Sequence, residues 1–355
     1  NGLMAMMPDA NAAGMGLDQF CPYYIDKLSA SYNMGFAVAC ISLVVSIAIY
    51  FATKSWFKHA DVNAKQAKTS GGNYVELTPK QTKERIVALC LVFAVVIFFW
   101  MAFHQNGQSL TWFARDYTQS TAEGWSRIGF NIWALALIAT SVYTLFGIFQ
   151  SEKASGKVGC GVVTAALWCG AYAIFKGLPN PLEIQPQLFQ QFNPFFVVAL
   201  TPVSLAIFGF LAKKGKEPSA PRKIGLGMLI AACGFGIMAF GSMGLPTPDA
   251  LAQGADVSLV SPNLLISTYL VLTFAELLLS PMGISFVSKV APPKYKGMMM
   301  GGWFVATAIG NYMVSIIGYL WGGIELWMVW SVLIVLCLLS ALFIFSIMKK
   351  LEKVA

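Results

Sequence analysis

One carboxylate in the middle of an apolar stretch is the residue of this sequence best placed to do chemistry. Residues 264–287 are mostly apolar and long enough to cross a bilayer as a helix, which needs about 20 residues. Glu276 lies near the middle, where an ionised side chain costs several kcal/mol unless it faces a cavity or a partner. Three polar side chains share its helix face, because they recur at intervals of three or four residues: Tyr269, Thr273 and Ser280.

Two interpretations of Glu276 are open. It could form a salt bridge with a neighbouring helix, but no Lys or Arg lies deep in any other apolar stretch. It could instead face a cavity, in which a ligand, a proton or a further segment of protein neutralises it, and this is the interpretation we expect. Pro281 removes a backbone hydrogen-bond donor, so a kink beside the charge is also expected.

His104 is a second candidate, near the outer end of the apolar stretch 86–106. Gln108 follows His104 by four residues, and Ser109 follows Gln105 by four, so a helix here would present a polar face. A histidine at this depth could carry a proton, since its unperturbed pKa is about 6.5. The alternative is an interfacial side chain that reaches water from among neighbouring aromatic residues.

Two further apolar stretches contribute polar residues. Asn193 and Pro194 begin the stretch 193–212, where Asn as N-cap and Pro at the first helical position is one interpretation. In the stretch 298–320, polar residues recur every four positions, and a ridge of small residues beside them would let another helix approach closely. The polar set is Trp303, Thr307, Asn311 and Ser315, and the ridge is Gly302, Ala306 and Gly310.

The polar faces of 264–287 and 298–320 would most simply line one aqueous cavity. A hydrogen-bonded seam between the two helices is the alternative.

The composition is that of a membrane protein. The 355 residues are 57% hydrophobic and 11% charged, whereas about 25% of the residues of a soluble domain are charged. The sequence therefore predicts an all-α integral membrane protein with nine transmembrane helices. The predicted spans are 33–52, 86–106, 132–149, 158–175, 193–212, 224–243, 264–287, 298–320 and 326–348.

The net charge of +8 reflects membrane orientation rather than a nucleic-acid-binding surface. Of the 24 Lys and Arg residues, 20 lie in alternate loops, which we place in the cytoplasm: 54–85, 151–157, 212–223, 288–297 and 349–355. Nine spans then put the N-terminus outside, without a signal peptide. Together with a first residue that is not Met, this predicts a C-terminal fragment of a longer protein.

The predicted organisation has four parts. Residues 1–32 are an irregular extracytoplasmic loop, 33–53 a single helix, 54–85 a basic cytoplasmic linker, and 86–355 a helical bundle that includes the hairpin 132–175. Within the linker, the spacing of an N-cap, a proline and a glutamine predicts a helix start: Thr78, Pro79 and Gln81.

Enzyme-like motifs are not found. The seven cysteines form no CxxC pair, so neither a disulfide framework nor a zinc site is indicated. The two histidines are far apart in the sequence, and there is no phosphate-binding glycine motif. We therefore expect no catalytic residues, no metal and no cofactor.

Three runs resemble the proton-dependent oligopeptide transporters of the major facilitator superfamily, from about Asn33 to the end of the chain. They are FWMAFHQNGQSLTWFA, FNPFFVVALTP and ELLLSPMGISFVSKVAPPKYKGMMMGGWFVATAIGNY. The resemblance implies the C-terminal half of such a transporter, in which 33–53 is the last helix of an N-terminal bundle that is otherwise missing. It also implies a multi-pass protein of a bacterial inner membrane.

The resemblance also implies roles for individual residues. The position of Glu276 holds the amino terminus of the substrate, and those of Asn193, Ser280 and Trp303 line the peptide pocket. Gln105 matches the Gln of a family motif. His104, just before it, stands where the family usually has a Glu that is linked to proton movement. Two further departures are the position of the hairpin 132–175 and the lack of the family's ExxERFxYY motif.

The function implied by the resemblance is uptake of di- or tripeptides coupled to protons. Glu276 would anchor the substrate, and His104 and Glu276 would be the candidates for proton coupling. Two alternatives remain: a proton-coupled transporter of organic anions or drugs, and a membrane scaffold subunit that does not transport.

Overall fold

The computed structural model describes residues 14–57 and 77–354 of the chain, and most of them are helical. Nine helices in this part are long and apolar enough to cross a membrane, as predicted. The chain divides into two compact units, Asn1–Glu76 and Leu77–Ala355. Part of the predicted loop 1–32 and most of the predicted linker 54–85 lie outside the described residues.

In the first unit, helix α3 (Leu17–Thr53) is followed by a short 3₁₀ turn, η1 (Lys54–Phe57). The prediction of an irregular loop through residue 32 is therefore wrong from Leu17 onward. Polar side chains such as Asp18 and Lys27 are exposed on the helix, and exposed polar side chains do not prevent helix formation. Polarity marks the end of the apolar span but not the end of the helix.

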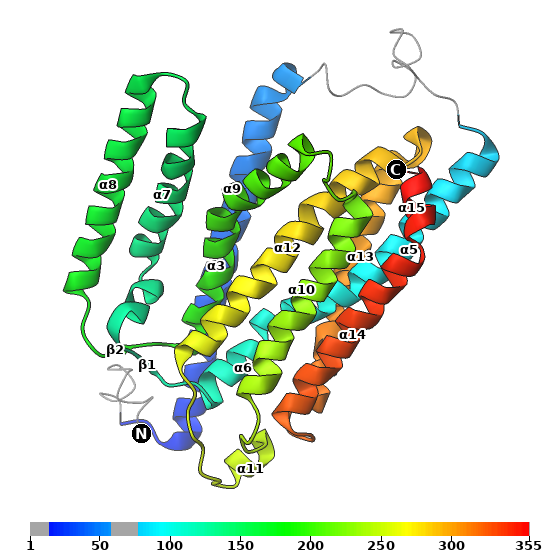
Figure 1. The fold of residues 1–355 in the computed structure, drawn as a ribbon. Coiled ribbons are helices and arrows are strands. Elements are labelled where there is room, and N and C mark those ends of the chain that lie inside the picture. Colours follow the sequence, from blue (N-terminus) through cyan, green and yellow to red (C-terminus); the bar gives the residue numbers. More distant parts are fainter. Residues whose placement is uncertain (1–13, 58–76, 355) are drawn as a thin grey trace. The chain divides into compact units, whose positions relative to one another are not determined.

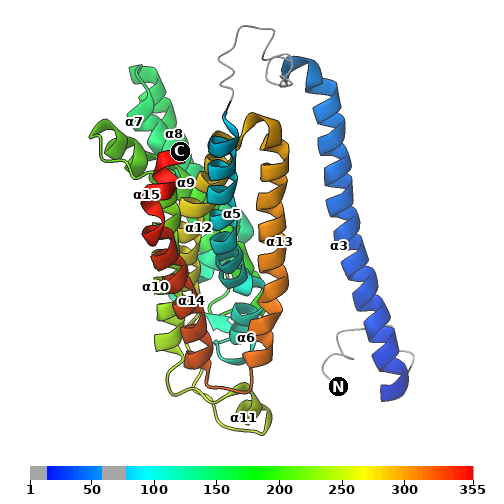
Figure 2. The same cartoon turned by 90° about the vertical axis from the view of Figure 1, so that its right-hand side faces the viewer.

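The second unit contains a core of five long helices, which Figures 1 and 2 show from two directions. Helix α10 packs between α12 and α14, and α13 lies along α5. Large side chains fill this core, including Phe99, Phe235, Trp303 and Trp330. The five helices are α5 (Pro79–Phe103), α10 (Ala220–Gly241), α12 (Pro262–Val290), α13 (Lys296–Leu320) and α14 (Leu326–Ser346).

Helix α5 begins as the sequence predicts. The side chain of Thr78 accepts a hydrogen bond from the Gln81 backbone N–H at 3.3 Å, and Gln81 Oε1 accepts one from the Thr78 N–H at 3.0 Å. This reciprocal pair satisfies two backbone donors that the first helical turn leaves free. Pro79 occupies the first turn, where its missing N–H costs nothing.

The other end of α5 differs from the prediction of a continuous helix to Asn106. Helix α5 stops at Phe103, a 3₁₀ turn η2 (His104–Gly107) follows, and α6 (Ser109–Asp116) begins after it. Glycine in a helix interior costs about 1 kcal/mol relative to alanine, and Gly107 is at the break. The polar residues of this motif therefore lie on a turn between two helices.

The hairpin predicted at 132–175 is confirmed as α7 (Ile132–Gln150) and α8 (Ala154–Gly177). Helix α7 packs on α8 and on α9 (Phe192–Lys213), whereas α8 packs on α7 and on the turn η3 (Gly124–Phe130). A two-stranded ladder, β1 (Thr121–Ala122) with β2 (Leu182–Glu183), closes the base of the hairpin. The remaining short elements are η4 (Pro186–Gln191), α11 (Pro248–Ala252), η5 (Pro293–Tyr295) and α15 (Met348–Val354).

Candidate functional site

The structure joins Asn193 on α9 to Glu276 on α12. The Asn193 side-chain amide, Nδ2, donates to Glu276 Oε2 at 2.9 Å and to Thr273 Oγ1 at 3.1 Å. Thr273 is fully buried, and Glu276 and Asn193 are half-buried. Two residues that are 83 positions apart in sequence therefore form one polar cluster inside the membrane-spanning part of the unit.

Asn193 does not cap its helix, so the interpretation of this residue as an N-cap is wrong, and its role in the peptide pocket stays a prediction. The turn η4 runs directly into α9, which begins at Phe192, and no side chain caps that start. The amide of Asn193 is therefore free to bond across to α12. The Asn-Pro pair suits a helix whose first residue is Pro194, but the preceding 3₁₀ turn continues into the helix, which starts two residues earlier, at Phe192.

Glu276 has no cationic partner among residues 14–57 and 77–354. The ion pairs found there join Arg115 to Asp116, Arg222 to Glu352, and Lys223 to Glu217. Its one hydrogen bond in the described residues uses Oε2, which leaves Oε1 for another partner. An ionised carboxylate at membrane depth with a single neutral donor has no positive charge to offset its desolvation. The arrangement therefore suits an incoming cation.

The polar face of α12 continues on both sides of Glu276. Tyr269 is buried, and its hydroxyl donates to the backbone carbonyl of Asn106 at 3.0 Å, which fixes the turn η2 to α12. Ser280 is half-buried and follows Glu276 by one helical turn. The predicted face thus has a packed end at Tyr269 and a more accessible end at Glu276 and Ser280.

Trp303 is buried against α12, and its exposed fraction is 2%. A Cβ atom added at Gly283 would lie 2.0 Å from Trp303 Cη2, so the indole occupies the space that this glycine leaves. The predicted small-residue ridge on α13 is confirmed, because a Cβ at Gly310 would lie 2.6 Å from the Ile97 carbonyl oxygen of α5. Close approach on both sides holds α13 in place.

Gln105 is completely buried in η2. Its Nε2 donates to the carbonyls of Met101 at 3.2 Å and Val314 at 3.3 Å, and its Oε1 accepts from the Ser109 hydroxyl at 2.5 Å. These bonds connect the end of α5 to α13. A contact of Gln105 with substrate stays a prediction, since its described bonds are all to protein.

His104 lies half-buried beside Gln105, at the end of α5. Its Nδ1 lies 3.0 Å from the Trp100 carbonyl oxygen, which can only accept, so Nδ1 carries the hydrogen. The ring packs against Trp100 and Phe103, with centroids 5.0 and 5.7 Å away. Nε2 is thus the nitrogen through which His104 could exchange a proton. No described hydrogen bond links His104 to Glu276.

The remaining polar residues of α13 have different surroundings. The hydroxyls of Thr307 and Ser315 donate to carbonyls of their own helix, and Asn311 and Ser315 are exposed. These internal bonds leave open whether the faces of α12 and α13 share an aqueous cavity, which stays a prediction.

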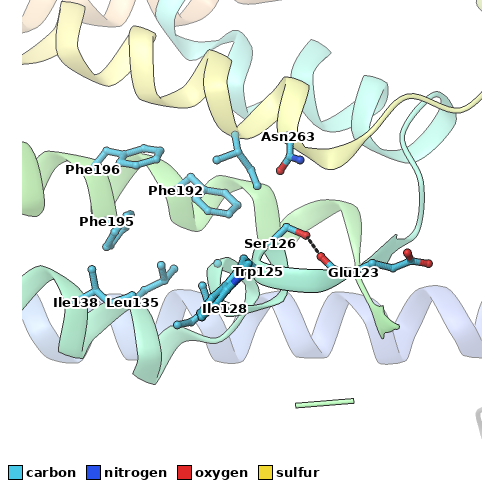
Figure 3. A pocket seen from close by; sticks show the side chains of 12 residues that line it. Glu123, Trp125, Ser126, Ile128, Leu135, Ile138, Phe192, Phe195, Phe196 and Asn263 are labelled. Atoms are coloured by element: carbon cyan, nitrogen blue, oxygen red, sulfur yellow. Dashed lines mark hydrogen bonds between the residues drawn. The ribbon is translucent and has the colours of Figure 1, made fainter. Parts of the chain in front are cut away.

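The cavity in Figure 3 lies elsewhere, between η3, α7, α9 and α12. It has a volume of about 510 Å³, and Phe192, Phe195 and Phe196 of α9 form one wall. Glu123, Ser126 and Asn263 contribute polar groups to it. It is a neighbour of the Asn193–Glu276 cluster and shares no lining residue with it.

Sequence reasoning missed Lys223, a buried cation at the start of α10. Its ammonium pairs with Glu217 at 2.5 Å, lies 4.2 Å from the ring centroid of Phe208 and contacts Met282 Sδ at 3.7 Å. It therefore links the loop after α9 to α10 and α12. Its position in a basic loop gives no sign of burial.

Known proteins resemble both the sequence and the fold. A model of the POT family (PTR2) matches residues 172–321. The peptide transporter YePEPT of Yersinia enterocolitica subsp. palearctica is 27% identical over 67% of this chain and 34% of its own length. Dipeptide and tripeptide permease B of Salmonella typhimurium is 26% identical over 83% of this chain and 56% of its own length. The chain thus spans about a third to a half of these relatives.

Solved structures share the fold at low sequence identity. A crystal structure of a peptide transporter POT in complex with sulfate has a TM-score of 0.54 and 18% identity, and the match covers 93% of this chain and 54% of that one. A POT family transporter in complex with a thioalcohol-conjugated peptide has a TM-score of 0.53 and 16% identity, over 95% of this chain and 56% of that one.

The nine apolar helices of the described residues and the bacterial relatives define a multi-pass protein of the inner membrane. The predicted all-α membrane fold is confirmed, because the described residues contain nine membrane-length helices and share their fold with a peptide transporter POT. The family match includes the second and third of the runs named above, at 192–202 and 276–312. Residues 172–321 thus match the POT family of transporters, and the chain is similar in sequence to bacterial peptide transporters and in fold to POT family transporters.

Proposed function

We propose that this chain supplies half of a proton-coupled carrier of di- and tripeptides, and that Glu276 binds the peptide amino terminus. The observation that carries the proposal is the Asn193–Glu276 hydrogen bond, which orients a carboxylate that has no described cationic partner. The names of its relatives, a peptide transporter and a dipeptide and tripeptide permease, support this substrate class.

The geometry explains why an ammonium group suits this position. Asn193 holds Oε2, so Oε1 can receive a donor without disturbing the contact between α9 and α12. At 4 Å and an effective dielectric constant near 20, opposite unit charges attract by about 4 kcal/mol before desolvation is subtracted. Ser280, one turn away, adds a hydroxyl that could bond the peptide backbone.

Peptide binding and proton release are linked at such a site. An ammonium group binds the ionised carboxylate better than the protonated one, so its arrival favours loss of a proton from Glu276. By reciprocity, protonation of Glu276 weakens peptide binding to the same extent. The lipid bilayer, protons and the helices that relatives have beyond this chain are the other partners that transport requires.

The test is Glu276→Gln in a transport-competent assembly that contains this chain. Glutamine keeps the size and an acceptor for Asn193 but removes the charge. We expect normal folding and binding of a free dipeptide weakened by at least about tenfold, which is 1.4 kcal/mol of the attraction above. Binding of the same dipeptide with an acetylated amino terminus should already be weak and should change little.

Isothermal titration of both peptides with parent and variant separates the alternatives. Equal weakening of both forms would show that Glu276 does not read the amino group, and would favour a carrier of organic anions or drugs. Unaltered binding of both would remove Glu276 from the substrate site. Thr273→Val is a matched control, because it removes the other acceptor of Asn193 and leaves the charge in place.

His104 is proposed to take part in proton coupling through its free Nε2. Replacement by glutamine removes titration near neutral pH and retains a donor for the Trp100 carbonyl. We expect the pH dependence of uptake in His104→Gln to shift or flatten between about pH 5 and 8. A pH profile that superimposes on that of the parent would leave His104 with a packing role only.

A further inference from the structure

The α7–α8 hairpin borders an open cavity that the proposed peptide site does not use. The cavity lies between η3, α7 and α8 and has a volume of about 560 Å³, within the range of about 300–1,000 Å³ typical of ligand pockets. Its walls are almost entirely apolar and include Trp125, Ile128, Ile138, Trp168, Cys169 and Tyr172. A water molecule needs polar partners that such walls do not offer, so an apolar occupant is favoured.

The position of the cavity in the bilayer indicates what that occupant is. Ile138 belongs to the membrane-spanning helix α7, and Trp168 and Tyr172 belong to the membrane-spanning helix α8. Trp168 and Tyr172 are exposed on the hairpin, with exposed fractions of 62% and 49%. At this depth the surrounding solvent is lipid, and Trp and Tyr are typical of the interface between acyl chains and headgroups.

Two cations lie at the same end of the hairpin. Only four of the 24 Lys and Arg residues fall outside the loops predicted to be cytoplasmic, and Arg127 and Lys176 are two of these four. The Lys176 ammonium is 5.1 Å from the ring centroid of Tyr172, a wall residue. Arg127 lies 4.7 Å from the ring of Phe175, which stacks on the wall residue Trp125.

Arg127 adds a buried positive charge. Its exposed fraction is 9%, and it donates to the carbonyls of Gly124, Leu178 and Pro179. Within residues 14–57 and 77–354 it has no carboxylate partner. Neutral carbonyls accept the hydrogen bonds of Arg127 but do not neutralise its positive charge. This end of the cavity therefore attracts an anion.

From these observations we propose that the cavity between η3, α7 and α8 binds an acyl chain of an outer-leaflet phospholipid, with its phosphate beside Lys176. Trp125, Ile128 and Ile138 separate this cavity from the one in Figure 3. Glu123 lines that second cavity, and its negative charge disfavours a phosphate on that side. The distribution of charge therefore assigns the headgroup to the Lys176 side.

Native mass spectrometry of the 355-residue chain, extracted from bacterial membranes in a mild detergent, would count retained phospholipids. Cys169→Phe places a ring in the cavity. The ring displaces part of the acyl chain, and each buried methylene group contributes about 0.8 kcal/mol, so displacement of two groups should lower lipid retention by at least about fivefold. Ala166→Phe is the matched control, because Ala166 is exposed on α8 and does not line the cavity. Lys176→Gln should lower retention by about fivefold, since one lysine near a lipid surface contributes about 1 kcal/mol.

Three results would overturn the proposal. Equal retention in Cys169→Phe and Ala166→Phe, with equal melting temperatures, would show that the cavity holds no acyl chain. Loss of lipid in Lys176→Gln alone would indicate a surface headgroup contact without a chain in the cavity. Retention of detergent but no phospholipid in the parent would identify the cavity as a detergent site. None of these readouts depends on peptide transport.

Discussion

The core around α12 and the α7–α8 hairpin both use polar side chains between helices, but they bury them to different degrees. In the core, Gln105, Thr273 and Tyr269 have exposed fractions of 0–1%. In the hairpin, a hydrogen bond of 2.7 Å joins the half-buried Thr144 and Thr164, and the exposed Trp168 donates to Ser141 at 2.9 Å. A polar side chain that loses its hydrogen-bond partner therefore has different surroundings in the two regions.

This difference predicts where substitutions of polar side chains destabilise the second unit most. A core side chain that loses its partner stays buried and unsatisfied, which costs the full desolvation of the polar group. In the hairpin, the hydroxyls of Thr144 and Thr164 also donate to the carbonyls of Ser141 and Cys160 in their own helices, so loss of the bond between them leaves neither side chain without a partner. We therefore expect the core to fix the geometry of the Glu276 site and the hairpin to accept variation.

The largest expected effect compares two glycines. Gly283→Ala places a methyl group 2.0 Å from the indole of Trp303 in the core, and should lower the free energy of unfolding by about 1–3 kcal/mol. Gly159→Ala in the hairpin has no atom within 4 Å of the new methyl group and should be neutral or stabilising by up to about 1 kcal/mol. Thermal unfolding in detergent measures both. Equal losses would remove the distinction between the regions.

The next comparison concerns hydrogen bonds. Gln105→Leu leaves the Val314 carbonyl and the Ser109 hydroxyl of the core without their partner, and should cost about 1–3 kcal/mol. Thr144→Val removes the hairpin bond to Thr164 and should cost about 0.6 kcal/mol, the average for such bonds between membrane helices. Denaturant titration in mixed micelles can resolve the two, and a costlier Thr144→Val would reverse the comparison.

The smallest effect lies where α15 meets the start of α10. The Ser219 hydroxyl donates to Glu352 at 2.6 Å, and this bond, with the guanidinium of Arg222 2.7 Å away, lowers the pKa of Glu352 below 4.5. The folded pKa is depressed, so the contribution to stability is present above the ordinary pKa and is lost as pH falls through the folded value. Both side chains are partly exposed, so salt should weaken the effect.

Melting temperatures between pH 7 and pH 3 would reveal that contribution. Glu352→Gln should remove the part of the acid-induced loss that is due to this carboxyl, whereas the neutral hairpin pair Thr144–Thr164 should show no matching pH dependence. The same acid-induced loss in Glu352→Gln and in the parent would assign it to other groups.

The sequence predicted what depends on local pattern. Thr78, Pro79 and Gln81 form the predicted helix start, and each predicted apolar stretch lies largely within a helix. The bounds were less accurate, because α3 begins at Leu17 and α5 at Pro79, well before the predicted spans 33–52 and 86–106. The 3₁₀ turns η2 and η4 were not predicted. The sequence around Asn193 is equally compatible with an N-cap and with a side chain that donates to another helix, so it could not decide between them. The ridge of small residues predicted a close neighbour but not its identity, α5.

The sequence predicted the central residue of the candidate site, Glu276, but not the hydrogen bonds that connect the helices around it. Glu276 stood out because a carboxylate is rare inside hydrocarbon. The bond from Asn193 depends on how α9 packs against α12, and the bond from Gln105 to Val314 joins positions 209 residues apart. Such pairings depend on tertiary packing. No local pattern in a single sequence indicates which distant residues will meet. The roles of these residues in substrate binding stay predictions.

The contact between Trp303 and Gly283 also limits how two helices can move. A slide of α13 along α12 by one helical turn is about 5.4 Å, and it would bring the indole against positions that carry side chains. Axial sliding is thus blocked, while rotation of both helices together is not. If the carrier alternates between inward and outward forms, α12 and α13 are expected to travel as one rigid pair. Glu276 and Trp303 would then keep a constant separation throughout the cycle.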